Sequence, residues 1–483
     1  MAEGVLRGPI PGKVPGGTIK PAWELRELPE PPQLGLKGLL QWAGPAVILG
    51  ALSVGGFEAY NAGYAAAQRF AGIFWLYIVS CFFQIFMNRE IGRYTMATGE
   101  TVLQGFTRLP PAKFWGPFAA LFCLVQQGWP AWIGGAMAGL AFLVGGQPEI
   151  YGMVGIGLVF ILFAASKYVY NTLEWLMYAA FVVANFGMVF MTIAMTRPEA
   201  VATVTSGWFA FGVIPAGITF AIVGPFFNQP AGGFWNFWQT YWIREKGMGM
   251  GAHMGKLTGL VTKEEDIRQI GLMFDTEDPI QLRRFQGWMR LNMTNLLLFF
   301  IVIGGILFTY FASLAGYSAA VIYNMQVPTG ARIAVVLAEV FGSAYGQIGF
   351  TLFALVLVFA LFDSQFSVND GIARMLSEAV QLEAPESWRR LGYRTWYFAA
   401  LGFITLVGMW AVWQATPYLI WVATNWLGNL VHAWLTVMLV WLNYTILPKN
   451  IRIEWWAIAI NLIWAVVVAA YFVAWTVIER PVF

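Results

Sequence analysis

The sequence predicts an all-α integral membrane protein with about eleven transmembrane helices. Hydrophobic residues make up 59% of the 483 residues and charged residues only 11%, whereas a soluble domain carries roughly a quarter charged residues. Stretches without Asp, Glu, Lys or Arg recur along the chain, and most are as long as the ~20 residues that a helix needs to cross hydrocarbon. These observations exclude a soluble globular protein.

The uncharged stretches place the spans in order along the chain. They are residues 38–57, 70–88, 114–148, 150–166, 175–196, 200–243, 291–331, 340–362, 395–448 and 455–478. The stretch 395–448 is too long for one crossing, and its Gln414-Ala415-Thr416-Pro417 segment is typical of a tight turn between two helices. This turn brings the count to about eleven.

The distribution of basic residues predicts the orientation. Lys and Arg follow every second span, and short loops with this excess are cytoplasmic. We therefore expect residues 1–36, which are rich in proline, to form a cytoplasmic N-terminal tail. Residues 37–448 would hold spans 1–10 with a cytoplasmic loop at 244–290, and residues 449–483 would hold span 11 and an external C-terminus.

Two spans share an unusual plan. Span 1 contains Gly44-Pro45 and then Gly55-Gly56, and span 6 contains Gly224-Pro225 and then Gly232-Gly233. Paired Gly/Pro interruptions in corresponding spans point to an inverted-repeat transporter, whose site lies where both helices unwind. The first and sixth of eleven spans are the positions of the five-plus-five inverted repeat of LeuT-type transporters. We therefore expect discontinuous helices 1 and 6, with breaks at about residues 54–57 and 229–233.

Several segments resemble Nramp-type (natural resistance-associated macrophage protein) divalent-metal transporters. Gly44-Pro45 before the first interruption, Trp75-Leu76-Tyr77 and residues 89–101 (REIGRYTMATGET) are similar to the first two spans of that family and the segment after them. Leu173-Glu174 and Arg389-Arg390-Leu391 are further similarities. The resemblance implies a secondary transporter that moves a divalent metal cation by alternating access.

The chain departs from that family at the two signatures. The family's span 1 motif, Asp-Pro-Gly-Asn, is Gly55-Gly56-Phe57-Glu58 here, and its span 6 motif, Met-Pro-His-Asn, is replaced around Pro230-Ala231-Gly232-Gly233. The Asp, Met and His side chains of the family are therefore missing at these positions. The resemblance implies a divergent, Nramp-related branch.

Glu58 is the most informative single residue, because an ionisable group at membrane depth is costly and marks a functional site by default. It is the candidate metal ligand, although its carboxylate would equally serve as a cap for the N–H groups of the following half-helix. The expected substrate- or ion-binding residues are Gly55, Gly56, Glu58, Asn61, Asn228, Gln229, Ala231, Gly232 and Asn425.

Polar residues of spans 8 and 10 form a candidate proton or polar pathway: Asp363, Asp370, Asn429 and His432. Asp363 and Asp370 lie seven apart and so share a helix face. Plain solvation is the alternative for Asp370, and hydrogen bonding between helices is the alternative for each amide.

Oxygen ligands of this kind suit Mn²⁺, Mg²⁺ or Ca²⁺ as the substrate, and we expect no cofactor. Two alternatives remain: a transporter of the same fold for a small organic or anionic solute, and a non-transporting structural subunit. In the latter, the tail with Trp23 would dock on a second copy or on another membrane protein. A net charge of +3 indicates no nucleic-acid partner, and no Ser/His/Asp set or phosphate-binding glycine loop indicates an enzyme.

Overall fold

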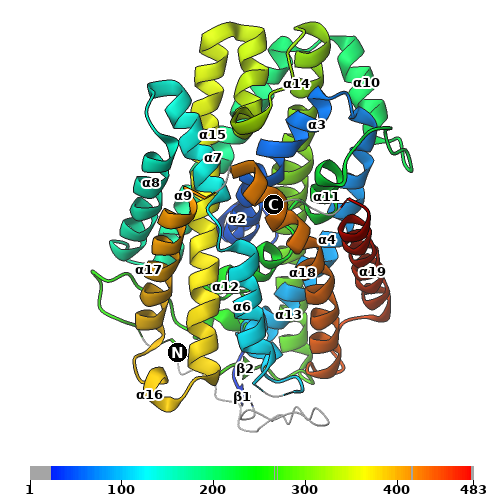
Figure 1. Cartoon of the computed structure of the whole chain (residues 1–483). Coiled ribbons are helices and arrows are strands. Elements are labelled where there is room, and N and C mark those ends of the chain that lie inside the picture. Colours follow the sequence, from blue (N-terminus) through cyan, green and yellow to red (C-terminus); the bar gives the residue numbers. More distant parts are fainter. Residues whose placement is uncertain (1–22, 112, 266, 269, 415–416, 480–483) are drawn as a thin grey trace.

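The computed structural model describes residues 23–111, 113–265, 267–268, 270–414 and 417–479, without the side chains of residues 56–59 and 331. Over these ranges the chain is a bundle of long helices that run side by side, with one two-stranded sheet at one end (Figure 1). The sheet pairs β1 (Glu24–Leu25) with β2 (Leu272–Met273) in parallel. The fold is all-α, as the sequence predicts.

The helices of the first half are, in chain order, α1 (Leu36–Trp42), α2 (Gly44–Ser53), η1 (Val54–Ala62), α3 (Gly63–Ala67), η2 (Ala71–Ile73), α4 (Trp75–Thr98), α5 (Val102–Phe106), α6 (Trp115–Gln127), α7 (Ala131–Val144), α8 (Pro148–Ala164), α9 (Val169–Met195) and α10 (Pro198–Trp208). Those of the second half are α11 (Phe220–Asn228), α12 (Phe234–Lys246), η3 (Gly249–His253), α13 (Pro279–Asn295), η4 (Leu296–Leu307), α14 (Phe308–Ile322), η5 (Gly330–Val335), α15 (Val336–Glu383), α16 (Glu386–Arg389), α17 (Tyr393–Ala411), α18 (Pro417–Thr445) and α19 (Trp455–Ile478).

Five helical stretches of the described chain are each long and apolar enough to cross a membrane: residues 71–98, 169–195, 279–322, 332–383 and 455–478. Among the other expected spans, α17 and α18 are single helices of 19 and 29 residues, whereas some are shorter or divided, such as α6 and α7, which residues 128–130 separate. The turn expected in the stretch 395–448 falls between α17 and α18, but residues 415–416 lie outside the described chain.

The expected break in helix 1 is wrong. Residues 54–62 do not unwind; the helix continues from α2 into α3 through η1, which has the wider turns of a π-helix. The glycine at its start serves a close contact instead. A Cβ on Gly55 would collide with the Ser364 hydroxyl and the Ala360 carbonyl oxygen of α15. Gly55 therefore lets the two helix backbones approach, as small residues do between membrane helices.

The expected break in helix 6 is confirmed. α11 ends at Asn228, Gln229 has an extended backbone (φ −98°, ψ 157°), and α12 begins only at Phe234. Gly233 precedes α12 with φ +66°, a conformation that residues with a Cβ rarely adopt. The break therefore spans residues 229–233, as the sequence predicts.

Three other features differ from the sequence expectation. The stretch 200–243 holds an additional helix, α10, before α11. α12 and α13 both extend into the expected loop 244–290, so that the connection between them is residues 247–278. The long helix α15 changes direction at Gly346, where φ is +63°. Charged residues extend helices beyond the membrane boundary, so uncharged stretches underestimate helix length.

Most basic loops gather at one end of the bundle, which we call the basic face. It carries β1, β2 and α16 at the bottom of Figure 1. Ion pairs tie its loops together: Arg89 and Arg93 both bind Glu454, at 2.8 and 2.7 Å, and Lys246 binds Glu174 at 2.7 Å. The membrane-facing surface between the two ends is apolar, as expected of an integral membrane protein.

The N-terminal arm, residues 23–31, docks on the basic face. Trp23 is only 2% exposed, its indole N–H donates to Glu100 at 3.1 Å, and the Arg108 guanidinium lies 4.9 Å from its ring centroid. Further along, the Leu28 amide donates to Gln281 and the Trp288 indole donates to the Pro29 carbonyl. The arm is thus bound to the chain's own α13 and to the end of span 2. Residues 1–22 of the expected tail lie outside the described chain.

Replacing Gly55 with alanine is expected to lower stability by about 1–3 kcal/mol, the usual cost of overpacking, because the new methyl group meets the α15 backbone. The measurement is thermal unfolding of the purified protein in detergent. Gly35→Ala is the matched control, because a Cβ there meets nothing within 4 Å. Equal melting temperatures for the two variants would contradict the close approach.

Glu100 predicts a pH dependence of arm docking. Burial raises the pKa of Glu100, but the Arg108 charge and hydrogen bonds from Arg108, Tyr94 and Trp23 outweigh it, so the pKa lies below the usual 4.5. Its stabilising effect is therefore present above pH 4.5 and is lost as the pH falls through the lowered value. The melting-temperature difference between wild type and Glu100→Gln should be constant above about pH 5.5 and should shrink as the pH falls below about 4.5. A difference that does not shrink below about pH 4.5 would show that the Glu100 charge does not stabilise the arm.

Candidate functional site

The break between α11 and α12 is the centre of the candidate site. Its freed main-chain groups bind side chains of α4 instead of other helix groups. The Ser80 hydroxyl donates to the carbonyl oxygens of Phe227, at 3.2 Å, and of Gln229, and the Ala231 amide donates to Gln84 Oε1 at 3.1 Å. These contacts satisfy main-chain groups that would otherwise be costly to bury.

A row of neutral polar side chains on α4 extends this support. Ser80, Gln84 and Asn88 lie four residues apart and so share one face. Asn88 donates to Asn236 Oδ1 at 2.6 Å, and Asn236 donates to Gln84 Oε1 at 3.2 Å. The sequence analysis missed this row. Its signal was the spacing of four in an otherwise apolar span.

Two asparagines approach the main chain of α11 from its two sides. Asn61 of η1 donates to the Ile222 carbonyl at 2.7 Å, and Asn429 of α18 donates to the carbonyls of Asn425, at 2.9 Å, and Gly224, at 3.5 Å. Both side chains are fully buried. A carbonyl oxygen can accept only from the NH₂ group of an asparagine. Each Nδ2 therefore faces a carbonyl oxygen, and each Oδ1 points away from it.

Asn228 and Asn425 join α11 to α18 across the break. Asn425 donates to the Trp421 carbonyl at 2.9 Å, and its Oδ1 accepts from Asn228 Nδ2 at 3.3 Å. Asn228 Oδ1 then lies against Gly232, where a Cβ would collide with it. Gly232 is therefore required for the approach of this oxygen.

These amides leave several acceptor oxygens without a hydrogen-bond partner inside the described chain: Asn61 Oδ1, Asn228 Oδ1, Gln229 Oε1 and Asn429 Oδ1. All four residues are at most 3% exposed. Buried polar atoms are nearly always satisfied, so each exception calls for a partner such as water or a ligand. An electron-rich set of oxygens is suited to a cation.

The expected residues of the first interruption are only partly described. Gly55 packs on α15, and the backbones of Gly56 and Glu58 lie within η1, but the Glu58 side chain lies outside the described part of the structure. The role of Glu58 as a metal ligand therefore stays a prediction. Ala231, by contrast, contributes its main-chain N–H to Gln84 and its buried side chain to the core.

Aromatic residues line the same region. The rings of Trp132 on α7 and Trp235 on α12 lie 5.2 Å apart, and both indole N–H groups lack a hydrogen-bond partner in the described chain. Tyr60 of η1 packs at 5.5 Å from Trp421 and donates to the Ala131 carbonyl at 2.9 Å. The region therefore offers unpaired donors as well as unpaired acceptors.

Asp363 and His432 are buried at membrane depth. Asp363 is 4% exposed and accepts from the Ser364 hydroxyl at 3.2 Å, and no described Lys or Arg forms an ion pair with it. Both ring nitrogens of His432 lack a hydrogen-bond partner among the described groups, and its ring lies 6.1 Å from that of Trp464. Both side chains remain candidates for carrying a proton.

Asp370 is neither solvated nor free. It is fully buried and binds Arg374 through both carboxylate oxygens at 2.8 Å, and it accepts from the Tyr397 hydroxyl at 2.8 Å. Arg374 also binds Glu245 of α12. The alternative expected for Asp370, solvation, is therefore wrong, and its expected place in a proton pathway stays a prediction.

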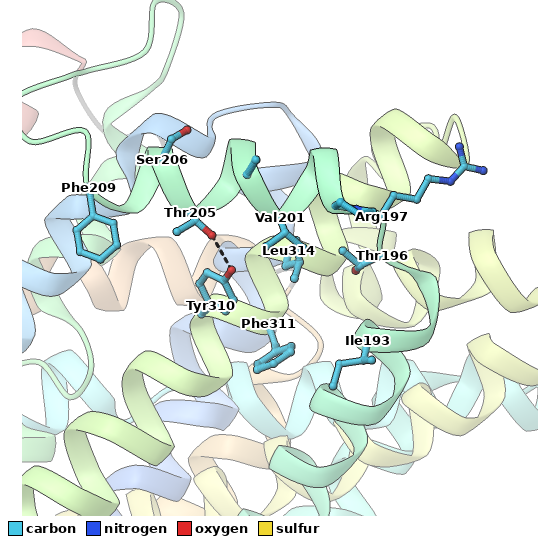
Figure 2. Close-up of a pocket in the computed structure, with 12 residues that line it drawn as sticks. Ile193, Thr196, Arg197, Val201, Thr205, Ser206, Phe209, Tyr310, Phe311 and Leu314 are labelled. Atoms are coloured by element: carbon cyan, nitrogen blue, oxygen red, sulfur yellow. Dashed lines mark hydrogen bonds between the residues drawn. The ribbon is translucent and has the colours of Figure 1, made fainter.

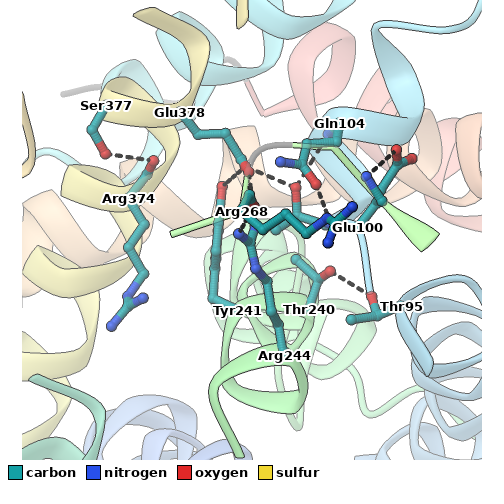
Figure 3. A network of polar contacts seen from close by, with 12 residues as sticks. Thr95, Glu100, Gln104, Thr240, Tyr241, Arg244, Arg268, Arg374, Ser377 and Glu378 are labelled. Carbon is teal, nitrogen blue, oxygen red and sulfur yellow. Dashed lines mark hydrogen bonds and ion pairs between the residues drawn. The ribbon is translucent and has the colours of Figure 1, made fainter. Parts of the chain in front are cut away.

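A second ion pair lies beside the first. Figure 3 shows Arg244 and Tyr241 of α12 converging on Glu378 of α15. Arg244 lies 3.6 Å from Glu378, and the hydroxyls of Tyr241 and Thr101 donate to it at 2.8 Å. These contacts, together with Glu245 and Arg374, fasten α12 to α15 near the basic face.

No group of three or more His, Cys, Asp or Glu residues that could hold a metal occurs among the described residues. A large groove of about 950 Å³ lies far from the break, between α9, α10 and α14 (Figure 2). Its lining is mainly apolar, and the hydrogen bond between Thr205 and Tyr310, at 2.7 Å, crosses it. It is therefore not part of the candidate site.

Similar structures settle the fold. No protein-family model matches the chain, and no curated protein sequence matches it. A manganese transporter of Eremococcus coleocola, solved with an aromatic bis-isothiourea substituted compound, is similar over 93% of this chain and 89% of its own, with 12% identity and a TM-score of 0.63. MhsT in complex with L-phenylalanine is similar over 89% of this chain and 98% of its own, with 12% identity and a TM-score of 0.53.

The chain has a LeuT-type fold. In proteins with this fold, the substrate site lies near the membrane midplane at the interrupted helices. The break in helix 6 is therefore the expected position of such a site. At 12% identity the similarity establishes the fold alone, and the residues of the site come from the geometry above.

Replacing Arg374 with methionine is expected to destabilise the protein by about 3–5 kcal/mol, because Asp370 and Glu245 would lose their buried partner. Arg390→Met is the matched control: its pair with Glu386 is exposed, and its loss costs at most about 1 kcal/mol. Thermal unfolding in detergent measures both. Similar melting temperatures would show that the buried pair does not fasten α12 to α15.

Proposed function

We propose that the protein is a secondary transporter that moves a small solute by alternating access around η1 and the α11–α12 break, with a divalent cation as its substrate. Mn²⁺, Mg²⁺ and Ca²⁺ are the candidate ions, and the basic face with the N-terminal tail is cytoplasmic while the C-terminus is external. The observation that carries the proposal is the set of buried acceptor oxygens on Asn61, Asn228, Gln229 and Asn429, whose residues lie along α11 and at its break.

The oxygen atoms available as metal ligands favour a hard cation over a thiophilic metal. Amide and main-chain oxygens are the ligands that Mg²⁺, Mn²⁺ and Ca²⁺ prefer. The Glu58 carboxylate, predicted from the sequence, would add a negative charge to them. Asp363, which lacks a cationic partner in the described chain, is suited to release and take up the proton that drives such transport.

A small organic solute is the second candidate, and a specific observation favours it. Trp132 and Trp235 offer two unpaired indole N–H groups on rings that lie 5.2 Å apart and tilted by 51° to each other. Such donors suit a carboxylate or another acceptor on an organic molecule. MhsT, which shares the fold, is solved with L-phenylalanine. A structural subunit is the third candidate, but the described part of the arm docks on its own chain and requires no second protein.

Uptake into proteoliposomes distinguishes the candidates. The purified protein is tested with Mn²⁺, Mg²⁺ and Ca²⁺ and, separately, with labelled amino acids and small carboxylates. Uptake of a metal supports the proposal. Uptake of an organic solute alone replaces it with the second candidate, and uptake of none under a proton or sodium gradient favours the structural subunit.

Asn61→Leu is expected to raise the half-saturating metal concentration about ten-fold or more, because one buried acceptor oxygen beside α11 is lost. Asn185→Leu is the matched control. Asn185 is also buried, donates to its own helix at 2.9 Å and has an unpaired oxygen, but it lies on α9. Equal uptake by the Asn61 variant and wild type would remove Asn61 from the site.

A further inference from the structure

A second site lies on the surface, away from the break. A groove of about 540 Å³ opens between the end of α8 and the start of α9, near the basic face. Its lining combines the apolar side chains of Leu162, Trp175 and Leu176 with the polar side chains of Lys167 and Asn171. The groove therefore has one charged and one apolar part.

Two lysines supply the charge. The ammonium groups of Lys167 and Lys256 lie 5.5 and 5.7 Å from the centroid of the Tyr168 ring, so both cations gather at one aromatic side chain. Neither forms an ion pair with a carboxylate in the described ranges. Glu265 accepts from the Tyr168 hydroxyl at 2.7 Å, which holds its negative charge at the hydroxyl end of the ring. Lys167 thus lines the groove itself, and Lys256 adds a second positive charge at the Tyr168 ring, which also lines it.

The start of α9 adds to the positive potential. Tyr168 occupies the N-cap position of this 27-residue helix, and no side chain caps its first turn. The Val169 N–H donates to the Leu257 carbonyl at 3.0 Å, but the N-terminus of a long helix also carries a partial positive charge that favours an anion. Lys167, Tyr168 and Asn171, which line the groove, all lie at this N-terminus.

The apolar part of the groove faces the membrane. Trp175 is 71% exposed one turn beyond Asn171, and on α8 Leu158 and Ile161 are 44% and 60% exposed. Tryptophan with this exposure is typical of the boundary between lipid head groups and hydrocarbon. A bound molecule that fills the groove therefore meets positive charge at one end and a lipid-like surface at the other.

We propose that this groove binds an anionic glycerophospholipid of the leaflet next to the basic face. Its phosphate would lie between Lys167, Lys256 and the start of α9, and one acyl chain would lie against Trp175 and Leu176. Basic pockets between membrane helices recognise acidic lipid head groups in this way. A zwitterionic lipid is a poorer match because its ammonium group is repelled by the two lysines.

Native mass spectrometry of the full chain in detergent tests the proposal. The protein is titrated with palmitoyl-oleoyl phosphatidylglycerol and, separately, with phosphatidylcholine of the same chains. Wild type should retain phosphatidylglycerol preferentially, and each lysine removed in Lys167→Gln and Lys256→Gln should weaken that retention about five-fold. Lys449→Gln, an exposed lysine on the same face, is the control and should change nothing. Trp175→Ala should weaken retention of both lipids.

Three results would overturn the proposal. The first is equal retention of the two lipids by wild type, and the second is an unchanged preference in the double variant Lys167→Gln/Lys256→Gln. Displacement of the lipid by glycerol phosphate alone would show that the groove binds a free anion, which would also reject a lipid site. Melting temperatures of the variants, measured beside wild type, show whether the fold is intact.

Discussion

The hydrocarbon core of a membrane offers no water to an unpaired backbone group, so a helix can be interrupted there only where other parts of the protein replace its hydrogen bonds. The break between α11 and α12 meets this condition through one neighbour. Ser80 and Gln84 of α4 bind main-chain groups on both sides of Pro230, and Asn88 and Asn236 hold Gln84 in place. The position of the break therefore depends on span 2 as much as on the glycines of span 6.

The same constraint explains how polar groups are distributed along the bundle. Neutral amides and hydroxyls surround the break, where an isolated charge would be expensive. Buried ion pairs lie near the basic face, as Arg374 pairs with Asp370 and Glu245, whereas the buried Asp363 has no ion pair with a described Lys or Arg. Because these ion pairs join α12 to α15, any movement that opens the basic face must either break the pairs or move α12 and α15 as one unit. The arm, bound to α13 and Glu100, is fastened to the same end of the molecule.

The candidate site combines two kinds of unsatisfied groups. Amide oxygens on η1, α11 and α18 are acceptors, whereas the indole N–H groups of Trp132 and Trp235 are donors. An ion that needs only oxygen ligands would use the first set, and an organic molecule with a charged group and an acceptor would use both. Each of the two proposed classes of solute therefore finds matching groups in this region.

The sequence by itself determined the membrane-helical class, the order of the spans and the break in helix 6, because these follow from local properties: uncharged stretches, glycine pairs and proline. It did not determine what happens at Gly55, because whether a glycine unwinds a helix or lets another helix approach depends on the neighbour, here α15. It also did not show that Asp370 is buried. Its partner Arg374 lies one turn further along α15, and its partner Tyr397 lies on α17. The row of Ser80, Gln84 and Asn88, and the arm against α13, likewise depend on contacts between distant segments, which only the tertiary structure decided.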